Sequence, residues 1–151
     1  MGTKIPIKTN LRRKPKKNMA KVNYFYATGK RKESSARVRV FHGKGENTVN
    51  AVSAEKYFPG KVSENLWKKP FRVTELSDKY YFSAKVAGGG KQGQLDALVN
   101  GIAKALVKIS EEKNKKELRK FGLLTRDSRI RQRRMVGMGG KSRRAKQSPK
   151  R

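Results

Sequence analysis

The residues with the clearest chemistry in this chain are the arginines and lysines near its C-terminal end. Residues 125–151 hold eleven cations and a single carboxylate, Asp127. Arginine forms forked, charge-assisted hydrogen bonds to phosphate oxygens, so this composition predicts a nucleic-acid backbone as the partner. A solvated tail is the alternative, but so many cations repel one another without a polyanion.

The same segment lacks the pattern of a folded element. Gly137, Gly139, Gly140 and Pro149 oppose regular structure, and the apolar residues follow no period after Ile130. Such a segment buries too little apolar surface to offset the entropy of ordering itself. We therefore expect an extended tail that becomes ordered along RNA.

A second basic cluster lies in residues 28–35, which read TGKRKESS. It combines Lys30, Arg31 and Lys32 with hydroxyl side chains, and these residue types contact phosphates in protein–RNA complexes. A solvated basic turn is the alternative. Residues 35–41 then alternate between apolar and polar, which places Arg37 and Arg39 together on the outer face of a half-buried strand.

Residues 88–93 (GGGKQG) form a glycine-rich turn between a predicted strand and a predicted helix. The spacing matches G-x-G-x-x-G, and two glutamates follow about 20 residues later, as in a dinucleotide-binding unit. Residues 110–116 lack the pattern of the second parallel strand that such a unit requires, so dinucleotide binding is disfavoured. Lys91 beside a helix N-terminus could instead hold an RNA phosphate. A tight structural turn is the equal alternative.

Residues for catalysis or metal binding are scarce. The chain has no cysteine and one histidine, His42, in a predicted turn. The sequence shows no carboxylate pair, nucleophile constellation or metal cluster, so we expect neither an enzyme nor a cofactor. Tyr24, Tyr26 and Tyr81 could stack on RNA bases where they face outward, although alternation predicts that most aromatic residues belong to the core.

The composition of the whole chain also favours nucleic acid. Forty lysines and arginines against 11 acidic residues give a net charge of +29 over 151 residues. A membrane-binding protein would need a basic amphipathic helix or an apolar anchor, and no apolar run approaches the roughly 20 residues of a membrane span. We therefore expect no membrane partner. The absence of cysteine is compatible with a reducing, intracellular compartment.

Periodicity predicts the elements that position these cations. We expect strands over 24–28, 35–41, 47–52, 71–75 and 79–87, with 35–41 and 47–52 forming a hairpin. An apolar stripe predicts the clearest helix over 94–109, in which Gly101 indicates a close backbone approach. Shorter helices are predicted from a Ser53 cap to Pro59, over 62–68 before Pro70, and from an Asn114 cap to Gly122.

These elements predict a two-layer α+β domain with a four- or five-stranded, mostly antiparallel sheet and helices on one face. The charge distribution divides the chain into a basic N-terminal extension (1–22), a globular RNA-binding domain (23–124) and an extended tail (125–151). We expect the extension to follow RNA. A solvated or targeting leader is the alternative, which Pro6, Pro15 and the absence of serine disfavour.

Residues 24–151 resemble the ninth protein of the small ribosomal subunit, a family found in all ribosomes. The resemblance rests on stretches in a fixed order: 27–38 (ATGKRKESSARV), 88–94 (GGGKQGQ), 101–106 (GIAKAL), 118–129 (LRKFGLLTRDSR) and the terminal Lys150-Arg151. Each stretch alone is unspecific, but together and in this order they are highly specific.

The resemblance implies a left-handed β-α-β crossover, against the general handedness rule. It implies a structural constituent of the small subunit, bound to ribosomal RNA of the head (the 3′ major domain) beside neighbouring ribosomal proteins of the head. It also implies that Lys150 and Arg151 contact the peptidyl-site tRNA. Pro149, where the family usually has serine, restricts the backbone just before these two residues. The implied location is cytoplasmic, with an organellar ribosome left open.

The resemblance implies that the residues of the basic clusters bind ribosomal RNA. They are Lys30, Arg31, Lys32, Arg37, Arg39, Lys91, Arg126, Arg129, Arg131, Arg133, Arg134, Lys141, Arg143, Arg144 and Lys146. The alternative function is that of a free nucleic-acid-binding protein, histone-like or chaperone-like, which has the same charge but no specific RNA partner.

Overall fold

Five strands form one sheet in the computed structural model, which describes residues 23–131 and residue 133. The strands are β1 (Tyr24–Arg31), β2 (Ser34–His42), β3 (Thr48–Val49), β4 (Val52–Ser53) and β5 (Tyr80–Ala87), in the spatial order β1-β2-β5-β3-β4. The pairs β1–β2, β2–β5 and β3–β4 are antiparallel, and β3–β5 is parallel. The predicted mostly antiparallel sheet is confirmed.

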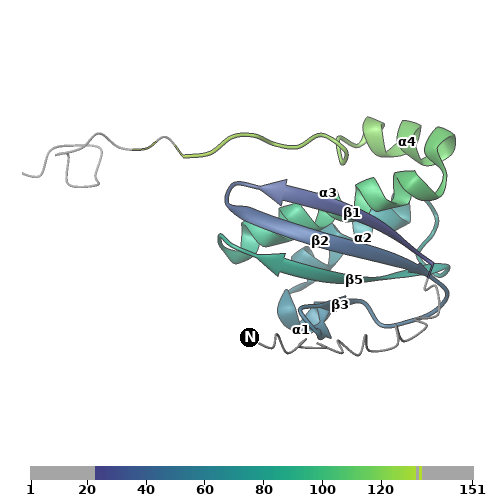
Figure 1. Cartoon of the computed structure of the whole chain (residues 1–151), viewed down its shortest axis with the longest axis horizontal. Coiled ribbons are helices and arrows are strands. Elements are labelled where there is room, and N and C mark those ends of the chain that lie inside the picture. The colour runs from purple at the N-terminus through teal and green to yellow at the C-terminus, as the bar shows by residue number, and fades with distance from the viewer. Residues whose placement is uncertain (1–22, 132, 134–151) are drawn as a thin grey trace, which may run out of the picture.

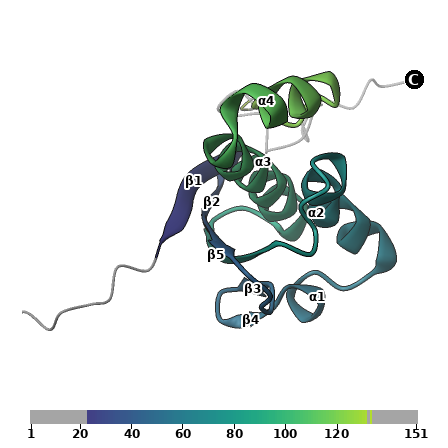
Figure 2. The same ribbon diagram turned by 90° about the vertical axis from the view of Figure 1, so that its right-hand side faces the viewer.

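The described residues form four helices: α1 (Ala54–Tyr57), α2 (Lys61–Val73), α3 (Lys91–Ile109) and α4 (Glu111–Lys120). α3 packs on β1 and β2, and α2 packs beside α3 on the same face of the sheet (Figure 2). α4 lies against α3 at the β1 side of the domain (Figure 1). This is the predicted two-layer α+β architecture. None of these helices is long and apolar enough to cross a membrane.

The core lies between the sheet and the helices. Val38, Val40 and Phe82 from the sheet and Leu98 and Ile102 from α3 are completely buried. The alternation of β2 and the stripe of α3 therefore bury the faces that their periodicity predicts. The same alternation leaves the opposite face of the sheet free of helices in the described part of the chain (Figure 1).

Two glycines set the distance between β1 and α3. A Cβ atom on Gly29 would lie 1.9 Å from the carbonyl oxygen of Ala97, and one on Gly101 would lie 2.7 Å from a methyl group of Val38. The nearest atoms to Gly29 are backbone, which cannot rotate away as a side chain can. The predicted close approach at Gly101 is confirmed, and Gly29 is its counterpart on the strand.

The prediction of a strand over 71–75 was wrong. Residues up to Val73 continue α2 through Pro70, and Trp67, Pro70 and Phe71 are buried. Phe71 stacks on Phe82 of β5 with ring centroids 6.1 Å apart. The aromatic and β-branched residues have a strand-like composition, but their three- and four-residue spacing places them on the buried stripe of a helix.

The hairpin predicted between 35–41 and 47–52 was also wrong. β2 pairs with β1 and β5, whereas β3 pairs with β4 and with β5. Asn50 and Ala51 both have positive φ values, as a two-residue turn between paired strands requires. The hairpin is therefore confined to residues 48–53. The parallel β3–β5 pair is connected through β4, α1 and α2, and the left hand of this crossover stays a prediction.

Three local predictions also needed correction. The strand predicted over 24–28 continues through Gly29, Lys30 and Arg31, which are therefore not part of a turn. Asn114 lies inside α4 and donates to the carbonyl of Leu106 at 2.8 Å, so it satisfies the last turn of α3 instead of starting a helix. Ser53 precedes α1 but makes no side-chain capping bond.

Candidate nucleic-acid interface

The face of the sheet that α2 and α3 leave uncovered, here called the open face, carries the predicted cations of β2. Arg37 and Arg39 are exposed, and Lys85 of β5 lies opposite Arg37 in the strand register. Lys30 of β1 is exposed on the same face. The outward residues of β1, β2 and β5 include no acid, and no ion pair to these four cations occurs in the described residues. They can bind phosphates without losing a carboxylate partner.

Arg31, at the end of β1, is in a different setting. Its guanidinium lies 3.0 Å from the carboxylate of Asp127 and 3.7 Å from that of Asp96 on α3. It also donates to the carbonyl of Arg129 at 2.5 Å. Only 14% of its side chain is exposed. Arg31 therefore attaches residues 123–129, here called the tail root, to the domain.

Asp127 is the centre of the tail root. Its carboxylate accepts hydrogen bonds from the Arg129 side chain, at 2.9 Å from Nη2, and from the Arg129 backbone N–H at 2.9 Å. These bonds, with smaller contributions from the charges of Arg129 and Arg31, hold the pKa of Asp127 at about 2, below its ordinary 3.8. The same contacts raise the pKa of Arg129. The one acid in the tail thus holds two of the chain's arginines.

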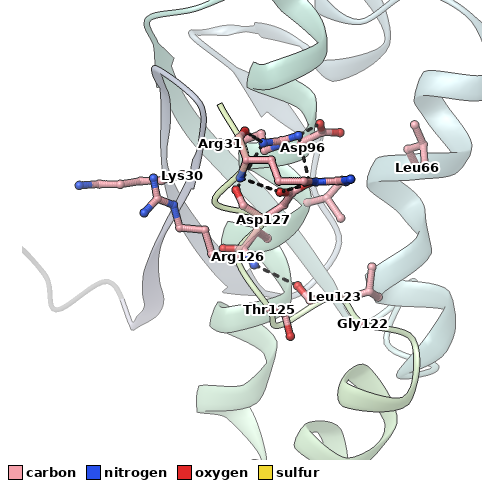
Figure 3. Close-up of a pocket in the computed structure, with 12 residues that line it drawn as sticks. Lys30, Arg31, Leu66, Asp96, Gly122, Leu123, Thr125, Arg126 and Asp127 are labelled. Atoms are coloured by element: carbon pink, nitrogen blue, oxygen red, sulfur yellow. Dashed lines mark hydrogen bonds and ion pairs between the residues drawn. The ribbon is translucent and has the colours of Figure 1, made fainter. Parts of the chain in front are cut away.

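Asn100 on α3 provides a second attachment for the tail root. Its Nδ2 donates to the carbonyls of Leu123 and Leu124 at 3.1 and 3.2 Å, and its Oδ1 is buried without a partner in the described residues. The root borders a cavity of about 410 Å³ whose other walls come from β1, α2 and α3. Figure 3 shows Arg31 and Asp127 paired beside it, while Lys30 points away from the pair.

The glycine turn before α3 is closely packed. Gly88 and Gly89 have positive φ values, and Cβ atoms there would lie 2.4 Å from the carbonyl oxygen of Glu33 and 2.3 Å from the hydroxyl of Ser34, where β2 begins. The carbonyl of Gly88 accepts hydrogen bonds from Ser34 and Gln94. This geometry favours the structural-turn interpretation. After α3 the chain continues as α4, not as a strand, so the dinucleotide alternative was wrong.

Lys91, predicted to bind RNA, is in contact with α1. Its Nζ donates to the backbone carbonyl of Tyr57 at 3.2 Å and lies 3.8 Å from the centre of the Tyr57 ring. Its RNA contact stays a prediction, as does that of Arg31. Lys32 is exposed at the β1–β2 turn with a positive φ.

The tail cations divide between described and undescribed residues. Arg126, Arg131 and Arg133 are exposed, and Arg129 is exposed while it binds Asp127. The other predicted residues lie outside the described part of the chain: Arg134, Lys141, Arg143, Arg144, Lys146, Lys150 and Arg151. In residues 23–131 and 133, no cluster of His, Cys, Asp or Glu could hold a metal ion.

Sequence reasoning missed three contributors. Lys85 could have been found, because the alternation that buries Phe82, Ala84 and Val86 also turns Lys85 outward. Asp96 and Asn100 share a helix with the apolar stripe, but their partners are remote in sequence. No local pattern indicates a contact between Arg31 and Asp127, which are 96 residues apart.

In the described residues the cations of the open face form no ion pairs, and together with the arginine-rich tail they are the features of a nucleic-acid-binding protein. The family model described as ribosomal protein S9/S16 matches residues 29–151. The chain is 42% identical to small ribosomal subunit protein uS9 of Cutibacterium acnes over 125 residues, covering 83% of this chain and 72% of that one. It is 43% identical to the protein of the same name from Desulfotalea psychrophila over 116 residues, covering 77% and 88%.

The chain belongs to the ribosomal protein S9/S16 family. Residues 29–124 of the folded domain and the whole tail fall within the matched residues. It is therefore a ribosomal protein, structural rather than enzymatic, as its lack of a catalytic constellation led us to expect.

Proposed function

We propose that this ribosomal protein is a structural constituent of the small ribosomal subunit. In this proposal the domain binds ribosomal RNA of the subunit head, beside other proteins of the head, and the tail contacts the peptidyl-site tRNA. The observation that carries it is the family match over residues 29–151, since the match includes the cations of the open face, the tail root and the tail. The implied location is a cytoplasmic or organellar ribosome.

Two classes of cation support a division of labour within RNA binding. Arg37, Arg39 and Lys85 lie on paired strands of the sheet, so the strand register sets the spacing of the charges that they present to folded RNA. The tail cations follow one another along the chain, so they can neutralise phosphates along an RNA path. Contacts of this kind position RNA without reading its sequence.

The tail root supports a directed tail. Residues 126–131 have no regular secondary structure and leave the domain in extended form (Figure 1). Arg31 and Asn100 hold the backbone of the tail root at four carbonyls, those of Leu123, Leu124, Asp127 and Arg129. A segment fixed at its start leaves the domain in one direction, which favours a defined target for Lys150 and Arg151.

A free protein that coats RNA or DNA is the second candidate, favoured by the net charge of +29. It accounts for the charge but not for a carboxylate-held root, because non-specific coating needs no fixed tail direction. It also predicts that affinity for every nucleic acid falls alike with salt.

Two truncations test the proposed roles of the tail in small subunits that are reconstituted with this chain. Removal of residues 150–151 should leave subunit assembly intact and weaken binding of peptidyl-site tRNA several-fold, because two cations are lost. Removal of residues 132–151 keeps the tail root but should also lower occupancy of the protein in the subunit. If both truncations behave alike, the division between RNA anchoring and tRNA contact is wrong.

A further inference from the structure

We propose that the open face of the sheet binds a single-stranded RNA segment by stacking on its bases. Tyr24 and Tyr26 stack on the bases, and Arg37 and Lys85 hold the neighbouring phosphates. This inference rests on the proposed RNA binding and specifies both the surface and the kind of RNA. It differs from a contact with an RNA helix, whose bases are already paired and stacked.

The strand register sorts the outward side chains of β1, β2 and β5 into rows across the sheet. The first row is Tyr24, Phe41 and Tyr81, the second is Tyr26, Arg39 and Ser83, and the third is Thr28, Arg37 and Lys85. Successive rows lie about 7 Å apart, since they are two residues apart along each strand. One end of the open face is therefore aromatic and the other cationic.

The first row is a supported aromatic surface. The rings of Phe41 and Tyr81 stack with centroids 5.2 Å apart at 17°, and Tyr24 leans on Phe41 at 5.8 Å and 53°. Gly45 of the β2–β3 loop lies against the Tyr81 ring, where a Cβ atom would be 2.8 Å from it. Phe41 and Tyr81 are consequently half-buried, and their packed rings support the ring of Tyr24.

Tyr24 and Tyr26 are the rings available to a ligand. They are 43% and 41% exposed, the highest values among the aromatic residues of the sheet. The guanidinium carbon of Arg39 lies 5.2 Å from the centre of the Tyr24 ring. Exposed rings interleaved with arginine are typical of single-stranded nucleic-acid sites, because each base has a π-face and each nucleotide a phosphate.

The third row supplies the phosphate contacts. Arg37 and Lys85 are exposed and directly opposite each other. Thr28 adds a hydroxyl group to the same row, and Ser83 of the second row accepts a hydrogen bond from Thr48 at 3.1 Å. The cations therefore lie one row from Tyr26 and two rows from Tyr24, where they can contact the phosphates of neighbouring nucleotides in an extended strand.

The charge of the open face favours single-stranded RNA over two other occupants, the chain's own N-terminal residues and an acidic peptide. The chain's own residues 1–22 carry eight cations and no acid, so the open face repels them. An acidic peptide would satisfy the cations but has no flat groups to cover Tyr24 and Tyr26. Single-stranded RNA satisfies both ends of the face.

The test measures binding of the full chain to a fluorescently labelled oligouridine of about ten nucleotides and to an RNA duplex of the same length. Tyr24→Leu and Tyr26→Leu should each weaken oligouridine binding about fivefold or more, since each removes one stacking ring. Tyr24→Phe and Tyr26→Phe should retain most of the affinity. The matched control is Phe121→Leu, because Phe121 is 56% exposed on the helical side of the domain. The tail is the same in every variant, so a difference in affinity between two variants reports the open face.

The outcomes separate this inference from the proposed function. If the leucine variants match Phe121→Leu, if the duplex binds as well as the single strand, or if polyglutamate displaces the RNA as effectively as oligouridine does, the inference is wrong while RNA binding stands. If the unaltered chain binds neither RNA, the proposed function itself fails. Circular dichroism checks folding, and if a leucine variant unfolds, Arg37→Gln with Lys85→Gln applies the same test at the phosphate end.

Discussion

The open face of the sheet and the tail root both contain arginine, yet their electrostatic settings are opposite. Arg37 and Arg39 share the open face with no acid, whereas Arg31 and Arg129 are held by Asp127. Net charge does not distinguish these regions; the positions of a few carboxylates do. The comparison separates two settings: in our proposal the cations of the open face bind RNA, whereas Arg31 and Arg129 form a structural joint around Asp127.

β1 connects the two regions, so its packing on α3 should have the largest effect on both. We expect Gly29→Ala to reduce the free energy of unfolding by about 3 kcal/mol, because the added methyl group would overlap the Ala97 carbonyl. Both RNA binding and tail attachment should then fail together. Urea unfolding with the linear extrapolation measures this loss.

Gly90→Ala is the matched control for Gly29→Ala. No atom lies within 4 Å of a Cβ placed there, and φ is −105°. We expect a change within about 1 kcal/mol, the range of substitutions at a helix N-cap. Equal effects of the two alanines would contradict the proposed contact between β1 and α3.

Two substitutions, one in each region, should have different effects on RNA binding and on tail attachment. Arg37→Gln should lower the dependence of log affinity for single-stranded RNA on log salt by about 0.7, since one phosphate contact is lost. Arg31→Gln should change this slope less but release the tail root, because Asp127 and Asp96 lose their shared cation. Salt titrations and the rate of tryptic cleavage after Arg126 or Arg129 measure the two effects. Identical behaviour of the variants would remove the distinction between the regions.

Acid should loosen the tail root, because the root depends on the ionised carboxylate of Asp127. The pKa of Asp127 is about 2 in the folded chain, below the ordinary 3.8. Its ionised form therefore stabilises the root above about pH 4, and this contribution is lost as the pH falls through about 2. The Arg129 amide resonance should report a transition near pH 2, and Asp127→Asn should abolish it. A transition near 3.8 would mean that the carboxylate is not held as the structure shows.

Local patterns could predict the open face better than the tail root. The alternation of residues 35–41 indicates the side on which Arg37 and Arg39 lie, and the apolar stripe of α3 indicates what covers the other side. The bonds of Arg31 to Asp127 join residues that only the tertiary fold brings together. Reading 71–75 as a strand failed for a related reason, because the burial of Phe71 against Phe82 outweighs its strand propensity.

Sedimentation of the tagged chain from a cell lysate, at moderate and then at high salt, tests the central claim most directly. That claim is that positioned cations on a folded domain, and not net charge alone, bind this protein to small-subunit RNA. We predict that it migrates with small ribosomal subunits and stays bound through the high-salt wash, because a shape-specific interface is less sensitive to salt than non-specific phosphate binding. Distribution over all nucleic acid, with complete release by salt, would contradict the claim and favour the free coating protein.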